Sequence, residues 1–84
     1  MVKTISVGLD ELTRRQQRSS VEVARVLAQR GRFTVFEATA NIDIARTIDR
    51  LQRKDWFTFD HSVGYPWTRC ALNEVGRRAL KEAP

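Results

Sequence analysis

Apolar and polar positions alternate at helical spacing in a segment near the start of the chain. Over Val21–Arg30, at a step of about 100° per residue, the apolar residues share one side: Val23, Ala24, Leu27 and Ala28. Ser19 and Glu22 have the spacing of a capping box, and Gly31 suits the left-handed residue that ends a helix. This stretch therefore predicts a helix with one buried face.

The segment Asp43–Lys54 predicts a second, longer helix with two unlike faces. Apolar residues and Asp55 fall within one narrow sector, and the apolar ones are Ile44, Ile48 and Leu51. Basic residues follow the opposite side at steps i, i+4, i+7 and i+8: Arg46, Arg50, Arg53 and Lys54. One face suits the core, and the other suits a negatively charged partner.

Between these helices, Thr34 and Glu37 form another capping box, which predicts a short helix ending near Ala40. After them, Trp56–Asp60 is aromatic and β-branched, and a turn containing Gly64 and Pro66 separates it from a second extended run. We predict a hairpin of two strands, the second over Thr68–Leu72, with Cys70 and Leu72 directed inward by alternation.

The two ends of the chain are predicted less completely. Asn73 suits the cap of a last helix over Glu74–Glu82, with an inner side formed by Val75, Ala79 and Leu80. At the other end, Thr4–Val7 suits a short strand and Asp10–Gln17 a short helix capped by Asp10. The arginines of this basic segment, residues 1–19, are consistent with a flexible arm, a helix packed on the domain or a dimer contact: Arg14, Arg15 and Arg18.

Composition narrows the function classes. A chain of 84 residues suits one small domain, and 15 Lys plus Arg against 10 Asp plus Glu give a net charge of +5. A basic surplus favours an anionic partner, nucleic acid before a membrane surface. With one cysteine and one histidine, neither an internal disulfide nor a metal site built from thiolates or paired histidines is expected. No membrane-spanning stretch or signal peptide is evident, so we expect a cytoplasmic protein. No cofactor is expected.

Catalysis is not expected either. Asp60 and His61 are neighbours on a predicted strand, so their side chains point to opposite faces, and neither Ser nor Cys is placed as a nucleophile beside both.

The order of elements, and two stretches in particular, resemble the winged helix-turn-helix domain of bacterial transcription regulators. Ile48–Phe57 resembles the end of a recognition helix and its turn into the wing, and Cys70–Leu80 resembles the second wing strand entering the closing helix of MarR-like and PadR-like proteins. The resemblance covers residues 20–82. It implies a mostly helical α+β fold: a three-helix helix-turn-helix core, a hairpin wing and a C-terminal helix, placed over residues 20–83.

The resemblance also implies a function, that of a bacterial or bacteriophage regulator that binds double-stranded DNA with the third helix in the major groove. Arg46, Thr47 and Arg50 would then contact bases, and Arg53 and Lys54 the backbone. Further contacts are expected from Arg32 and Thr34 at the start of the second helix and from the wing residues Tyr65, Trp67 and Arg69.

This sequence departs from the family in two respects. The stretch Thr34–Asp55 is shorter than is usual, and the wing tip His61–Trp67 carries aromatic side chains in place of Lys or Arg. The aromatic wing leaves open an alternative, a protein-interaction module such as a phage inhibitor or adaptor. A homodimer contact is a further expectation, through residues 1–18 and 74–83.

Overall fold

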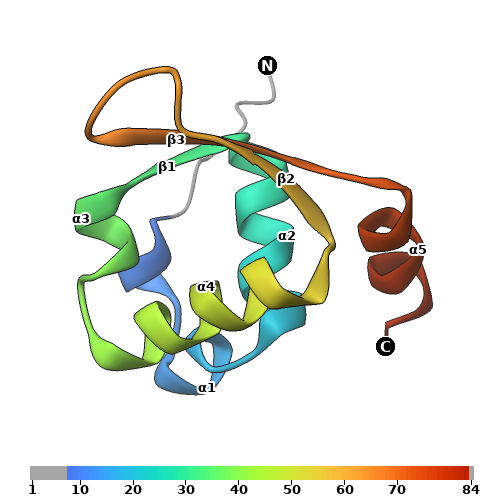
Figure 1. The fold of residues 1–84 in the computed structure, drawn as a ribbon. Helices are drawn as coiled ribbons and strands as arrows, with labels where there is room; N and C mark the ends of the chain where they lie inside the picture. The colour runs from blue at the N-terminus through green and yellow to red at the C-terminus, as the bar shows by residue number, and fades with distance from the viewer. Residues whose placement is uncertain (1–7, 84) are drawn as a thin grey trace, which may run out of the picture.

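A computed structural model describes residues 8–83 of the chain; the strand predicted at Thr4–Val7 lies outside them. The helices are the short 3-10 helix η1 (Leu9–Glu11), α1 (Arg14–Gln17), α2 (Ser20–Arg30), α3 (Val35–Ala38), α4 (Ile42–Lys54) and α5 (Glu74–Glu82). The strands are β1 (Arg32–Thr34), β2 (Phe57–Asp60) and β3 (Trp67–Leu72). The fold is therefore α+β and mostly helical, with one antiparallel sheet (Figure 1).

The two long helices begin and end at residues whose local chemistry favours a cap. The Ser19 side chain accepts a hydrogen bond from a first-turn amide of α2, and Gly31 ends that helix at φ +77°. Asn41 caps α4 in the same way, and Asp55 ends it in the left-handed region at φ 59°. The helices predicted over Val21–Arg30 and Asp43–Lys54 are confirmed.

The sheet has the spatial order β1-β3-β2, with β3 in the centre. Its alternation is clear, because Thr68 and Cys70 are buried whereas Trp67 and Arg69 face outward. The hairpin of β2 and β3 is confirmed. Strand β1 was not predicted, because it has three residues and gains its order from pairing with β3, Arg32 lying opposite Arg69.

A single apolar core lies between the sheet and the helices α2 and α4 (Figure 1). Its buried residues come from η1, α2, α4 and the three strands: Leu9, Val23, Ala24, Leu27, Phe33, Ile44, Ile48, Leu51, Phe57 and Cys70. One predicted core position is wrong, since Val75 is 53% exposed. Leu80 packs against the core as predicted, and Gly76 faces the interior in place of Val75, because α5 approaches the chain at Trp56 closely enough to require glycine there.

The described part of the N-terminal segment belongs to the same core. Leu9 is fully buried, and the Gln17 amide donates to the carbonyl oxygen of Leu9 at 3.3 Å. The helix predicted over Asp10–Gln17 is shorter than expected, because Thr13, not Asp10, caps α1. Of the three interpretations of this basic segment, packing on the domain describes residues 8–19.

Replacing Gly76 tests this close packing. A Cβ at Gly76 would lie 2.2 Å from the carbonyl oxygen of Trp56, a contact that only a backbone shift relieves. We expect Gly76→Ala to lower the free energy of unfolding by about 1–3 kcal/mol, measured by urea denaturation. Val75→Ala, at the neighbouring exposed position, is the control and should change stability little. Unchanged stability in Gly76→Ala would show that α5 does not pack as described.

Candidate nucleic-acid interface

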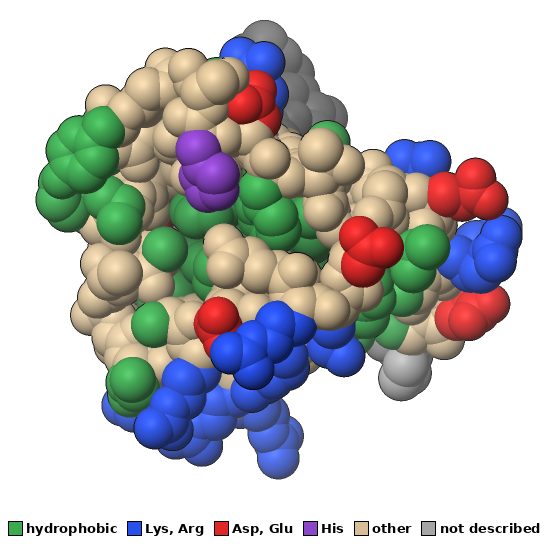
Figure 2. All heavy atoms as spheres, in the orientation of Figure 1, with side chains coloured by type: hydrophobic (Ala, Val, Ile, Leu, Met, Phe, Trp, Pro, Cys, Tyr) green, Lys and Arg blue, Asp and Glu red, His purple; other side chains and the backbone are tan. Residues whose placement is uncertain are grey.

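Basic side chains gather on one face of the molecule. In Figure 2 they cover the lower part of the surface, over α1 and α4 of Figure 1. All are exposed, and this basic face comprises Arg14, Arg15, Arg18, Arg46, Arg50, Arg53 and Lys54. The two predicted faces of α4 are confirmed, because Ile44, Ile48 and Leu51 are buried while its Lys and Arg side chains are exposed.

A buried carboxylate joins α1 to the start of α4. The Nε atoms of Arg14 and Arg18 lie 2.7 and 3.3 Å from the two Asp43 oxygens, and Asp43 is only 9% exposed. The hydrogen bond from Arg14, with a further one from Arg18, holds the pKa of Asp43 below its usual value of 3.8, against the opposing effect of burial. Because α1 is too short to be stable alone, this contact fixes its position.

Thr47 also holds α1 in place, so its predicted contact with bases is wrong. The side chain is fully buried. Its hydroxyl lies 2.5 Å from the Gln17 carbonyl oxygen and 2.9 Å from that of Asp43. The hydroxyl is therefore used within the fold, and α1 covers the flank of α4 on which Thr47 lies.

The basic side chains of α4 differ in their contacts. Among residues 8–83, Arg46 has no hydrogen-bond or ion-pair partner. Arg50 donates to the carbonyl oxygen of Arg18 at 3.1 Å, and Arg53 forms an exposed ion pair with Asp49 at 3.1 Å. Exposed pairs of this kind contribute little to stability, so Arg53 can exchange its partner at low cost.

The second predicted phosphate site, at the start of α3, is already occupied by protein groups. The Thr34 hydroxyl accepts from the Glu37 amide at 3.1 Å, and Glu37 forms an ion pair with Arg30. Burial raises the pKa of Glu37, but the hydrogen bonds and charge of Arg30, together with Thr34, outweigh it and lower the pKa. The carboxylate stays charged and the Thr34 hydroxyl is engaged within the fold, so these contacts do not support the phosphate contact expected at Thr34, which stays a prediction.

The wing residues separate into two groups. Tyr65 is 82% exposed and lies edge-on to Phe36 of α3, with ring centroids 6.0 Å apart. Trp67 instead lies beneath the Arg32 guanidinium, 4.6 Å from its ring centroid. Phe57 and Phe59 pack against each other, with ring centroids 5.6 Å apart.

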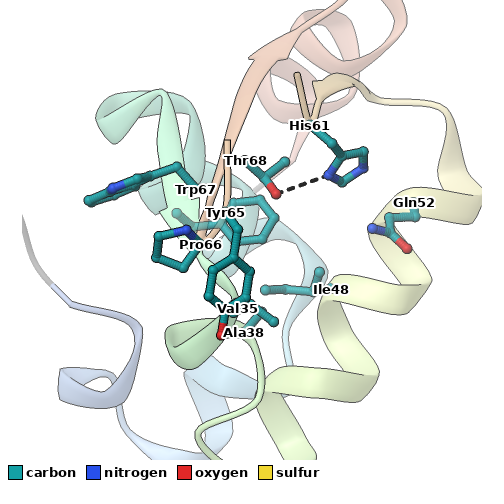
Figure 3. A pocket seen from close by; sticks show the side chains of 10 residues that line it. Val35, Ala38, Ile48, Gln52, His61, Tyr65, Pro66, Trp67 and Thr68 are labelled. Atoms are coloured by element: carbon teal, nitrogen blue, oxygen red, sulfur yellow. Dashed lines mark hydrogen bonds between the residues drawn. The ribbon is translucent and has the colours of Figure 1, made fainter. Parts of the chain in front are cut away.

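A shallow hollow of about 360 Å³ lies between the wing, α3 and α4 (Figure 3). Figure 3 shows Tyr65 and Pro66 on one side of it, and His61 with Gln52 on the other. His61 Nδ1 is 3.1 Å from the Thr68 hydroxyl. The lining of the hollow contains no Lys, Arg, Asp or Glu, so this surface differs in chemistry from the basic face.

The groups that could suggest catalysis are engaged or buried. Asp60 accepts hydrogen bonds from the Ser62 amide and hydroxyl at 2.9 and 2.6 Å. Cys70 is buried, and burial raises the pKa of its thiol to about 11. Across residues 8–83, no group of three or more His, Cys, Asp and Glu side chains is arranged for a metal ion. No helix of this part of the chain is long and apolar enough to cross a membrane.

The structure places α1 directly beside the predicted basic side of α4. The run of arginines before Ser19 was visible in the sequence, but its position beside α4 depends on contacts between residues about thirty apart, such as Gln17 with Thr47. Conversely, Arg32 belongs to a different part of the molecule, since β1 crosses the top of Figure 1 whereas α1 and α4 lie below.

Comparisons with protein-family models, with curated proteins and with solved structures gave no match. The functional argument therefore depends on the residues and geometry of this chain.

The Asp43 contact makes a prediction about stability and pH. A carboxyl whose pKa is lower in the folded state stabilises the fold above its unfolded-state value and loses that contribution as pH falls through the folded value. We expect Asp43→Asn to be less stable than the wild type at neutral pH, and the difference to shrink below pH 3.8. Urea denaturation at both pH values measures this.

Asp49→Asn is the matched control for that comparison, because Asp49 lies on the same helix in an exposed ion pair. It should change stability little at either pH. Equal stability of Asp43→Asn and the wild type at neutral pH would show that the contact of Asp43 with Arg14 and Arg18 does not hold α1.

Proposed function

We propose that the chain is a winged-helix protein that binds double-stranded DNA and regulates transcription, with α4 as the helix that enters the major groove. The order α2, β1, α3, α4, β2, β3, α5 supports this proposal, as does the strand order β1-β3-β2. Both are compatible with the winged-helix arrangement that the sequence resembles.

The observation that carries the proposal is the continuous basic face of α1 and α4 (Figure 2). Two carboxylates are paired with its arginines, Asp43 with Arg14 and Arg18, and Asp49 with Arg53. Lys and Arg side chains that face a duplex release counterions from its phosphates, which is the main source of affinity for DNA. A face this basic on an amphipathic helix suits that partner.

The role of each basic side chain follows from its position along α4 and from its contacts with other protein groups. Arg46 lies in the N-terminal half of α4 and has no hydrogen-bond or ion-pair partner among residues 8–83, which suits a bidentate contact with a guanine edge. Arg50 lies one turn further on. Arg53 and Lys54, at the C-terminal end, suit the backbone. The major groove is about 12 Å wide and admits one helix, so α1 would lie over the bordering phosphates, where Arg15 is exposed.

Gel-shift titration tests these roles. Arg46→Ala should weaken binding to the preferred duplex roughly tenfold or more, because a bidentate base contact is worth about 1–3 kcal/mol. It should also reduce discrimination between sequences. Arg78→Ala on α5 removes the same charge from an exposed ion pair outside the basic face and should have little effect. Equal affinity of Arg46→Ala and the wild type on every duplex would contradict the role of α4.

A second candidate function is binding of another protein through the wing. The exposed pair Phe36 and Tyr65 favours it, since two large rings in mutual contact are 62% and 82% exposed. Aromatic side chains of this kind serve as anchors in protein interfaces. If the wild type fails to bind any duplex even at low salt, this candidate replaces the first. The homodimer, likewise, stays a prediction.

A further inference from the structure

The outer face of the sheet carries a second group of cationic and aromatic side chains, which we call the sheet cluster: Arg32, Trp67 and Arg69. Strand pairing brings them together, because Arg32 is the direct partner of Arg69 and Thr34 of Trp67. All three side chains of the cluster are exposed. They therefore lie on the surface of the sheet that faces away from the core.

Within the sheet cluster, Trp67 holds Arg32 in one orientation. The guanidinium carbon lies 4.6 Å from the centroid of the ring, a distance at which a cation is attracted to the ring face. Since Arg32 is exposed, its guanidinium is accessible to a ligand from solvent. A planar cation that is already ordered loses less entropy when a ligand stacks on it, and nucleobases stack on such planes.

Arg69 supplies a charge beside that plane. Among the described residues it forms no ion pair within 4.0 Å. Asp60 is its cross-strand neighbour on β2, and the hydrogen bonds from Ser62, with a further contribution from the charge of Arg69, lower the pKa of Asp60. Asp60 thus offsets part of the Arg69 charge without holding the guanidinium in an ion pair. The Arg69 guanidinium is therefore available to a phosphate.

A hollow of about 350 Å³ adjoins these groups, within the range of small-ligand sites. It is lined by Gly31, Val63 and the three residues of the sheet cluster, with no carboxylate among them. Apolar contact is available from Val63 and the indole, and positive charge from the two arginines. This combination suits a ligand that is both planar and anionic.

We propose that the sheet cluster binds one nucleotide unit of a single-stranded nucleic acid. The base stacks on the outward face of Arg32, above Trp67, and the adjoining phosphate pairs with Arg69. Base stacking combined with a cationic contact is the usual way in which proteins bind single strands without sequence preference. The geometry favours a single strand because a base within a duplex does not present its face to a side chain.

This site is separate from the basic face. Strands β1 and β3 cross the top of Figure 1, whereas α1 and α4 lie toward its bottom. The inference therefore does not rest on the proposed function, and either can fail without the other.

Fluorescence of Trp67 provides the test. Trp56→Phe removes the other tryptophan of the chain and leaves Trp67 as the only one. In this background, an oligothymidylate of about eight nucleotides is titrated at low salt. Saturable quenching of Trp67 is expected, and Arg32→Ala or Arg69→Ala should weaken binding about tenfold each, the order of one stacked base or one charged contact.

Matched variants separate the two sites. Arg46→Ala, on the basic face, should leave oligothymidylate binding near the wild-type value, and Arg78→Ala on α5 controls for net charge. If Arg32→Ala and Arg69→Ala bind the oligonucleotide as tightly as the wild type, the sheet cluster is not the site. Loss of binding in Arg46→Ala alone would place the strand on the basic face and also overturn the inference. Circular dichroism of each variant confirms that the fold is retained.

Discussion

The buried carboxylate of Asp43 is the contact on which the arrangement of the basic face depends. Arg14 and Arg18 approach it from α1, while the Thr47 hydroxyl reaches the carbonyl oxygen of Gln17 on the same short helix. Four residues are too few to form a stable helix by themselves. Without these contacts, the arginines of α1 would not be held next to those of α4.

One consequence is that two arginines serve the fold rather than a ligand. Arg14 and Arg18 direct their Nε atoms to Asp43, so part of their charge is offset locally. Arg15 and Arg46 have no such partner in the described part of the chain, and they are the side chains most available to an anion. The positive charge of the chain, +5 overall, is thus unevenly distributed over the surface.

Local signals in the sequence were enough to predict most of the fold. Caps such as Ser19 and Asn73 have their partners within one turn, and the apolar stripe of α4 is a property of that segment alone. The positions that could not be predicted depend on distant segments. Thr47 lies at the edge of the basic stripe and is buried only because α1 covers it, and β1 exists only because β3 lies beside it.

The candidate site was predicted in part for the same reason. Helical spacing identified the basic side of α4, but it could not show that Glu37 pairs with Arg30 or that Arg32 stacks on Trp67. Both contacts join segments that approach one another only in the folded chain. The prediction for Val75 failed because the path of α5 is set by its close approach to Trp56 at Gly76.

The salt dependence of duplex binding tests the central proposal most directly. If Lys and Arg of the basic face neutralise phosphates, the logarithm of the binding constant falls linearly with the logarithm of salt concentration, and Arg15→Ala reduces the slope by about one. A binding constant that does not change with salt, or a slope identical in Arg15→Ala and the wild type, would contradict the account.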